Sequence, residues 1–233
     1  MTIVYRLGSK LYLNITNDCS CSCVFCIRNN TDGVGDAASL WLEREPTLEE
    51  IKAALIASLS NRDDTHDNAS LPHDTLTMGT ASSGVSYPSH DIDEIVFCGY
   101  GEPMLRADVV IEVAQYIKDN FSSFYRKPAP PVRINTNGLA FLMCPGFDVS
   151  RLSVVDTVSI SLNADDAEEY QRLARPRYGV GAFDSLLDFA REASAYTSVV
   201  FSVVEGTLSA ERMENCWRIA GEMGIPLRVR GME

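Results

Sequence analysis

Short apolar stretches of strand period alternate with amphipathic stretches of helical period along most of this 233-residue chain. Six strands are predicted, at residues 11–16, 94–99, 132–137, 156–163, 197–205 and 226–230. Helices are predicted between most of them, at residues 47–59, 107–121, 167–174, 183–196 and 209–224. Strands that alternate with helices form parallel sheets with right-handed crossovers. The pattern therefore predicts an α/β fold with a mostly parallel sheet.

Residues 61–93 interrupt this alternation. They contain one arginine against six aspartates, and Ser, Thr, Gly and Pro dominate the rest. Such a segment has too few apolar side chains to contribute much to a core. We therefore expect a single domain over residues 1–233 with an acidic, disordered insertion at 61–93. All three histidines lie in this insertion, which leaves no histidine elsewhere for acid–base chemistry.

The charge balance disfavours a broad nucleic-acid surface. Lys and Arg number 20 against 32 Asp and Glu, a net charge of −12, and such a surface repels phosphate backbones. No apolar run approaches the roughly 20 residues that span a bilayer, and the first residues lack an apolar signal segment. Seven cysteines, an odd number, argue against a disulfide framework. We expect a cytoplasmic protein with no membrane contact.

Four of the seven cysteines fall within eight residues, directly after the first predicted strand: Cys19, Cys21, Cys23 and Cys26. A structural zinc site usually takes two separated Cys-x-x-Cys pairs, and only one such pair is present here. Three thiolates separated by three and two residues suit an iron–sulfur cube in which one iron lacks a protein ligand. A non-catalytic zinc-binding scaffold is the alternative interpretation.

The Cys-x-x-x-Cys-x-x-Cys motif after a first strand, with an aromatic residue before its last cysteine, resembles the radical S-adenosylmethionine (SAM) superfamily. The resemblance implies that Cys19, Cys23 and Cys26 hold a [4Fe-4S] cluster whose fourth iron is chelated by SAM. It also implies that Phe25 packs near the adenine and that Cys21 is not a ligand.

Further matches follow the later strands. Residues 98–103 resemble the Gly-Gly-Glu-Pro motif that binds the amino group of SAM, which implicates Gly101 and Glu102, although Tyr100 replaces the first glycine. Asn137, with Thr136, matches a Thr-Asn-Gly segment near SAM. For these two segments the alternative interpretation is an ordinary turn.

Two more candidates come from the fourth predicted strand and the helix after it. Ser161 and Asn163 resemble a Ser-Leu-Asp segment that binds the ribose hydroxyls, with Asn163 in place of Asp. In the basic run at 172–177, Arg175 is the candidate for the SAM carboxylate, and a solvated helix end is the alternative. All these motifs follow strand ends, where a barrel of parallel strands places its active site. Six strands rather than eight predict an open partial (β/α)6 TIM-like barrel.

Residues 5–47, 96–103 and 159–183 together resemble the small radical SAM proteins associated with TatD-type hydrolases. This resemblance implies an enzyme of oxidoreductase type that reductively cleaves SAM to a 5′-deoxyadenosyl radical for hydrogen abstraction from an unknown substrate. It also implies a reductant such as flavodoxin or ferredoxin and a functional link to a TatD-type hydrolase. A glycyl-radical-enzyme activase is the catalytic alternative.

Overall fold

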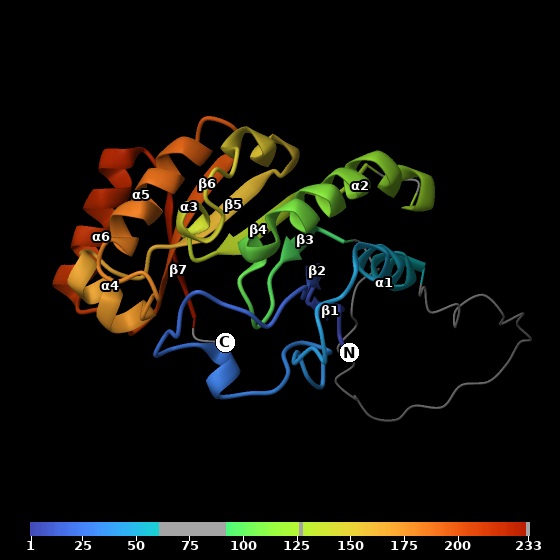
Figure 1. Cartoon of the computed structure of the whole chain (residues 1–233), viewed down its shortest axis with the longest axis horizontal. Helices are drawn as coiled ribbons and strands as arrows, with labels where there is room; N and C mark the ends of the chain where they lie inside the picture. The colour runs from blue at the N-terminus through green and yellow to red at the C-terminus, as the bar shows by residue number, and fades with distance from the viewer. Residues whose placement is uncertain (61–91, 126–127, 232–233) are drawn as a thin grey trace, which may run out of the picture.

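The computed structural model describes residues 1–60, 92–125 and 128–231 and contains one seven-stranded sheet in the order β1 to β7 (Figure 1). Strands β2 to β7 are parallel, and β1 pairs antiparallel with β2 at one edge. The sheet does not close, so the predicted open partial barrel of six parallel strands is confirmed. The strands are β1 (Val4–Leu7), β2 (Lys10–Leu13), β3 (Glu94–Phe97), β4 (Val132–Thr136), β5 (Thr157–Ser161), β6 (Ser198–Val204) and β7 (Leu227–Arg230).

The five predicted helices are all present, with ends shifted by a few residues. They are α1 (Leu48–Ser60), α2 (Ala107–Tyr125), α4 (Ala167–Ala174), α5 (Ala182–Ala193) and α6 (Ala210–Met223). The capping box at the start of α1 forms, because the Thr47 N–H donates to the Glu50 carboxylate at 2.8 Å and the Glu50 N–H donates to the Thr47 hydroxyl at 3.3 Å. Gly224 ends α6 with a left-handed φ of 65°.

Four short elements were not predicted: α3 (Ala140–Met143) and the 3-10 turns η1 (Ile27–Asn29), η2 (Pro103–Arg106) and η3 (Val149–Val154). The four-residue strand β1 was not predicted either. Each of these five elements is too short to establish a clear period by itself.

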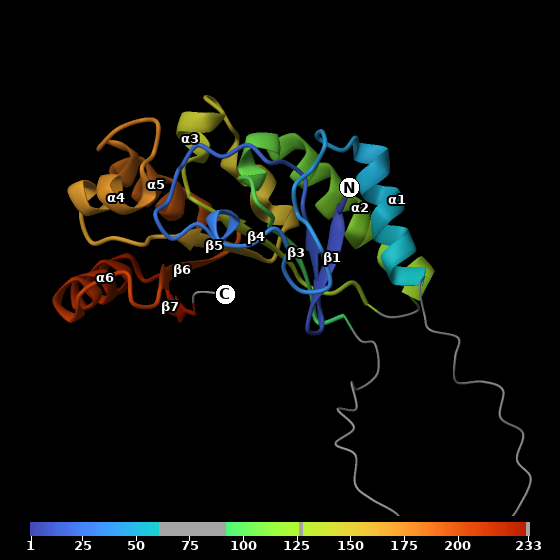
Figure 2. The same ribbon diagram turned by 90° about the horizontal axis from the view of Figure 1, so that it is seen from below.

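The two faces of the sheet differ in character because successive strand residues point to opposite sides. One face packs on the helices and is apolar and fully buried, as at Ile95, Phe97, Ile134, Ile160 and Phe201. The helices lie around this outer side of the curved sheet (Figure 2). We call the opposite side the inner face; it carries the cross-strand row Tyr12, Val96, Arg133, Thr157 and Ser198 and the residues two positions along each strand.

A nearly buried ion pair lies on the inner face. Arg133 is 6% exposed and donates to both carboxylate oxygens of Glu94 at 2.9 Å, and Lys10 donates to the same carboxylate at 2.8 Å. Removing Glu94 would leave the nearly buried guanidinium of Arg133 without its carboxylate, and a loss of this kind costs about 3–5 kcal/mol in a buried pair. This pair therefore ties together β2, β3 and β4.

Most of the predicted insertion, residues 61–91, lies outside the described residues, so its disorder stays a prediction. Its last two residues are described and belong to the fold. Ile92 is buried against the core, and the Asp93 N–H donates to the Ser9 carbonyl at 2.9 Å, leading into β3. Among the described residues no helix is long and apolar enough to span a membrane.

Candidate functional site

The cysteine loop follows β2 and is hydrogen-bonded to the C-terminal end of α4 and the residues just after it. The Ser22 N–H donates to the Ala174 carbonyl at 3.0 Å, and the Val24 N–H donates to the Leu173 carbonyl at 2.9 Å. A β-bridge joins Cys21 to Pro176. Segments about 150 residues apart in sequence are therefore held side by side, which brings the basic run 172–177 to the cysteines.

The four clustered thiols are free, and they differ in burial. Cys19, Cys23 and Cys26 are partly exposed, whereas Cys21 is 3% exposed. The predicted ligand set therefore consists of the accessible thiols. A hydrogen bond from the Cys21 thiol lowers the pKa of Cys19 to about 6 and also lowers the pKa of Cys23. The same two interactions and burial raise the pKa of Cys21.

Two arginines accompany these thiols. A pocket of about 360 Å³ is lined by Cys23, Cys26, Arg28 and Arg175, together with Ser22, Val24 and Asn29. Thiolates are stabilised by nearby cations. Arg28 contributes to lowering the pKa of Cys19, Cys23 and Cys26, although burial leaves the pKa of Cys26 raised overall. This is a suitable setting for thiolate ligands.

Arg28 was not predicted from the sequence. Its guanidinium donates long hydrogen bonds to the carbonyls of Asn17 and Tyr100 at 3.4 Å and of Cys21 at 3.5 Å. These contacts connect both ends of the cysteine loop to the turn after β3. The sequence feature that could have indicated Arg28 is its position, as a cationic residue two positions after Cys26.

The kinds and number of side chains in the cysteine loop are those that an iron–sulfur cluster takes. Structural zinc sites need four such ligands in a tetrahedron. Three accessible free thiols on one loop provide the ligands that a cubane with one open iron requires.

Glu102 lies in the turn after β3 and is 4% exposed. Its carboxylate accepts the N–H groups of Met104 at 3.0 Å and Asn137 at 2.7 Å, so it does cap a turn. Burial raises the pKa of Glu102 to about 7, and these backbone donors act in the opposite direction. A carboxyl group with this pKa changes its charge near neutral pH.

Asn137 joins this turn to the cysteine loop. Its N–H donates to Glu102, and its side-chain amide donates to the Ser20 hydroxyl at 2.9 Å and lies 3.9 Å from the Cys19 sulfur. The structure therefore brings together three residues predicted separately from three strand ends: Cys19, Glu102 and Asn137.

Gly101 allows the loop and the turn to touch. A Cβ at this position would lie 2.3 Å from the Thr16 carbonyl oxygen and 2.6 Å from the Asp18 carbonyl oxygen. Both neighbours are backbone atoms and cannot move aside cheaply. Glycine is needed here for close approach of two chain segments.

Tyr100, which departs from the superfamily motif, belongs to a second small core. It is 3% exposed, packs edge-to-face on Trp41 with ring centroids 5.0 Å apart, and its hydroxyl donates to the Thr31 carbonyl. The larger side chain thus anchors the segment that follows the cysteine loop.

The only two non-glycine residues with positive φ in the described ranges are both predicted cofactor residues, Asn163 (52°) and Arg175 (48°). Such backbone conformations are costly and concentrate at functional sites. Asn163 is buried and its side-chain oxygen accepts the Val204 N–H at 3.2 Å. Arg175 is exposed and ends α4 beside the pocket.

Ser161 and Phe25, two further predicted cofactor residues, do not line the pocket beside the cysteines. Ser161 ends β5 on the inner face, opposite Ser202 of β6, and is half-buried. Phe25 is half-buried in the cysteine loop and does not line the 360 Å³ pocket. The structure brings the cysteines, Glu102, Asn137 and Arg175 together; contact between any of these residues and SAM stays a prediction.

No family model and no curated protein matches the sequence. Solved structures do match. SuiB of Streptococcus suis bound to S-adenosylmethionine has a TM-score of 0.60 at 13% identity, over 97% of this chain and 42% of SuiB. The protein anSMEcpe with bound AdoMet has a TM-score of 0.60 at 13% identity, over 95% of this chain and 50% of its own.

A third structure, TYW1 with a lysine–pyruvate adduct bound, has a TM-score of 0.57 at 13% identity, over 96% of this chain and 65% of TYW1. The chain has the fold of these proteins. It spans between 42% and 65% of their lengths, and at this identity the likeness establishes the fold alone.

Proposed function

We propose that this chain is a radical SAM enzyme whose [4Fe-4S] cluster is held by Cys19, Cys23 and Cys26. One observation carries the proposal: three accessible free thiols lie on the loop after the first parallel strand and are joined through Asn137 to the buried Glu102. The fold, shared with two proteins solved with S-adenosylmethionine bound, supports it.

The residues around the thiols have complementary chemistry for SAM. Glu102, next to Gly101, offers a carboxylate to the SAM ammonium group, and its ionisation is favoured as that cation approaches. Arg175 offers a guanidinium to the SAM carboxylate. Ser161 and Asn163 offer hydrogen-bond partners to the ribose, and Phe25 offers a ring to the adenine. Held by these residues, the reduced cluster and SAM would supply one-electron cleavage of SAM to methionine and a 5′-deoxyadenosyl radical for hydrogen abstraction from the substrate.

Asn137, which is also a candidate for contact with SAM, and Arg28 hold other groups of the site in position. Asn137 fixes Glu102 relative to Cys19, and Arg28 connects the cysteine loop to the Tyr100 turn. Because these groups are already held in place, less entropy is lost when the cofactor is oriented in the site.

The test is anaerobic reconstitution with iron and sulfide, followed by dithionite and SAM. We expect close to four irons per chain, as in any [4Fe-4S] protein, and formation of 5′-deoxyadenosine and methionine. A chain that takes up zinc but no iron, or that carries a cluster without cleaving SAM, would contradict the proposal. The matched control is Cys216→Ala, which removes a buried cysteine far from the loop in sequence.

The finer assignments belong to the same proposal. Kinship with the TatD-associated group, a functional link to a TatD-type hydrolase, electron supply by flavodoxin or ferredoxin, and a cytoplasmic location rest on the sequence motifs and composition. Replacing dithionite with reduced flavodoxin or ferredoxin in the SAM-cleavage assay tests the electron donor directly.

A further inference from the structure

Cys21 is the clustered cysteine that the proposed set of iron ligands leaves out. Its side chain is buried and belongs to the main core, whereas the three proposed ligands are half-buried. The β-bridge to Pro176 fixes its backbone. The Cys21 sulfur is therefore held on the interior side of the loop that carries the ligands.

Several hydrogen-bond donors surround the sulfurs of this loop. The Cys21 N–H donates to the Cys19 sulfur at 3.4 Å, and the side-chain amide of Asn137 donates to the same sulfur at 3.9 Å. The Cys21 thiol is hydrogen-bonded to the sulfurs of both Cys19 and Cys23. The Cys19 sulfur thus has donors from its own loop and from the turn after β4.

Buried polar groups hold these donors in place. The hydroxyl of Tyr170, a buried residue of α4, donates to the Asn137 carbonyl at 3.2 Å and also interacts with the Cys21 thiol. The Asn137 amide donates in addition to the hydroxyl of the buried Ser20 at 2.9 Å. Because water is largely excluded from this layer, its hydrogen bonds are stronger than those in solvent.

Donors at these positions affect how easily a cluster is reduced. A cysteine that binds iron is a thiolate, which accepts hydrogen bonds and donates none. With Cys19 and Cys23 as ligands, the proton in their hydrogen bonds to Cys21 has to belong to Cys21. Reduction adds one negative charge to the cluster and its thiolates, and hydrogen bonds to the sulfurs stabilise the more negative state. Donors to these sulfurs therefore raise the reduction potential.

We propose that Cys21 is not an iron ligand but donates a hydrogen bond to the ligand sulfurs of Cys19 and Cys23 and so raises the reduction potential of the cluster, with the Asn137 amide as a second donor. The inference rests on the proposed function, because it needs these two cysteines as ligands. It makes Cys21 a positioning residue. A higher potential lets the cluster accept its electron from a weaker reductant.

Two other roles for Cys21 predict different results. A residue that only fills the core would affect stability when it is replaced and would leave the reduction potential unchanged. A fourth iron ligand would be required for full iron content. The reduction potential and the iron content of the same variants therefore separate the three roles.

The test is the reduction potential of the reconstituted full chain without SAM, measured by potentiometry and followed by electron paramagnetic resonance. We expect Cys21→Ala to keep its cluster and to shift the reduction equilibrium about tenfold toward the oxidised form, which is about 59 mV for one electron. Cys21→Ser retains a donor and should have a potential at or above that of wild type. Cys216→Ala, the matched control, removes a buried cysteine outside the loop and should leave the potential unchanged.

Asn137→Ala tests the second donor. It removes the side-chain amide, while the backbone N–H that donates to Glu102 remains. We expect a lower potential in this variant as well, and an unchanged potential would overturn the part assigned to Asn137.

Three results would overturn the role of Cys21: an unchanged potential in Cys21→Ala, an equal fall in Cys21→Ser, or loss of iron from a folded Cys21→Ala. Where Cys21→Ala does not fold, Cys21→Val keeps the apolar volume without the donor and carries the same expectations. SAM cleavage with an unchanged potential in Cys21→Ala would defeat this inference alone. A lowered potential in that variant, in a chain that does not cleave SAM, would defeat the proposed function alone.

Discussion

At the scale of single residues, Glu102 is the sharpest test of the cofactor site, because two backbone N–H groups hold it in place. Glu102→Gln keeps the shape and one acceptor but removes the charge that would meet the SAM ammonium group. A charge-assisted hydrogen bond is worth about 1.5–3 kcal/mol, so we expect SAM affinity to fall roughly ten- to a hundredfold with the cluster intact.

The turn-capping role of Glu102 predicts a lower melting temperature as well, since the new amide must face a backbone donor. Affinity and melting are therefore measured on one anaerobic sample. Glu169→Gln is the control, because Glu169 is a buried carboxylate that pairs with Arg172 on α4. Unchanged SAM binding with lowered melting would eliminate the cofactor role of Glu102.

The raised pKa of Glu102 predicts a pH dependence. Burial favours the neutral carboxyl group and brings its pKa to about 7. The neutral carboxyl group of Glu102 contributes stability to the fold that is fully present below its ordinary pKa near 4.5. This stability is lost as pH rises through about 7, where the buried group becomes charged. SAM affinity should change in the opposite sense, strengthening between about pH 6 and pH 8. A titration in which wild type and Glu102→Gln show the same pH profile would assign the dependence to another group.

Sequence patterns singled out most residues that the structure brings together at the candidate site, but not their geometry. Cys19, Glu102 and Asn137 could be singled out because each sits in a short motif at a strand end. The left-handed backbone conformation of Asn163 and Arg175 could not be predicted from the sequence, because neither residue type reliably indicates a positive φ. Arg28 was missed because its role depends on how the loop folds back on itself, toward the carbonyls of Asn17 and Cys21, and on the distant carbonyl of Tyr100.

At the scale of elements, the contact between the cysteine loop and the turn after β3 depends on Gly101. Gly101→Ala would place a methyl group 2.3 Å from the Thr16 carbonyl oxygen. Overpacking of this kind costs about 1–3 kcal/mol, so we expect a lower melting temperature and reduced iron incorporation. Gly181→Ala is the control, because nothing lies within 4 Å of its Cβ position. Normal iron content in Gly101→Ala would show that the loop does not need this close approach.

Elements within longer periodic or apolar runs were predictable, including the four-residue strands β2, β3 and β7, and short elements outside such runs were not. The helix α2, with 19 residues, and the strand β6, with seven, carry enough residues to define a period. The edge strand β1 has four residues, and its pairing with β2 depends on a tight turn at Gly8, where φ is 60°. Its apolar alternation is too brief to separate it from a loop.

The composition of residues 61–91 predicts that their removal is tolerated. Replacing them with a short Gly-Ser linker should leave the melting temperature and the iron content unchanged, because the segment has few apolar side chains. Ile92 and Asp93 are kept, since both belong to the fold. A fall of several degrees in the melting temperature would show that the segment contributes to the core.

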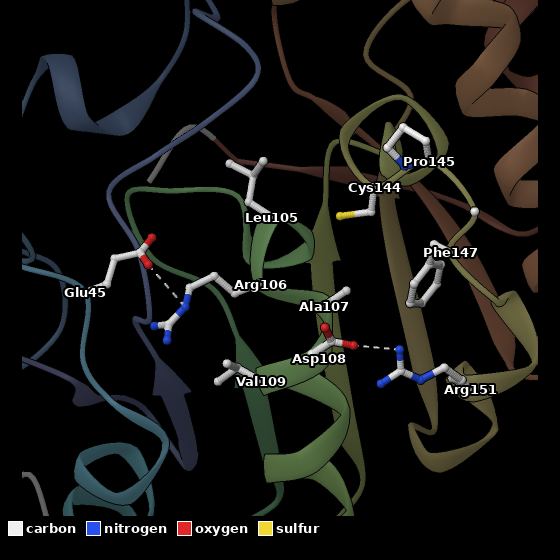
Figure 3. A pocket seen from close by; sticks show the side chains of 11 residues that line it. Glu45, Leu105, Arg106, Ala107, Asp108, Val109, Cys144, Pro145, Phe147 and Arg151 are labelled. Atoms are coloured by element: carbon white, nitrogen blue, oxygen red, sulfur yellow. Dashed lines mark hydrogen bonds and ion pairs between the residues drawn. The ribbon is translucent and has the colours of Figure 1, made fainter.

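At the scale of the whole molecule, the open barrel gathers distant segments at one edge of the sheet. The cysteine loop follows β2, Glu102 follows β3, Asn137 follows β4, and the chain after α4 completes the site. Because parallel strands all end at the same edge, motifs far apart in sequence had to meet there. A second pocket, of about 510 Å³, lies beside the start of α2. Among the residues that line it, Arg106 pairs with Glu45 and Arg151 pairs with Asp108 (Figure 3). The charged side chains of this pocket named here are thus paired with each other.

The most direct measurement of the central claim is the electron paramagnetic resonance spectrum of the reduced, reconstituted chain before and after SAM is added. We predict a [4Fe-4S] signal that SAM alters, that persists in Cys21→Ala, and that is absent in Cys19→Ala, Cys23→Ala and Cys26→Ala. A signal that is insensitive to SAM, or that is lost equally in Cys21→Ala, would contradict the assignment of three ligands and one open iron.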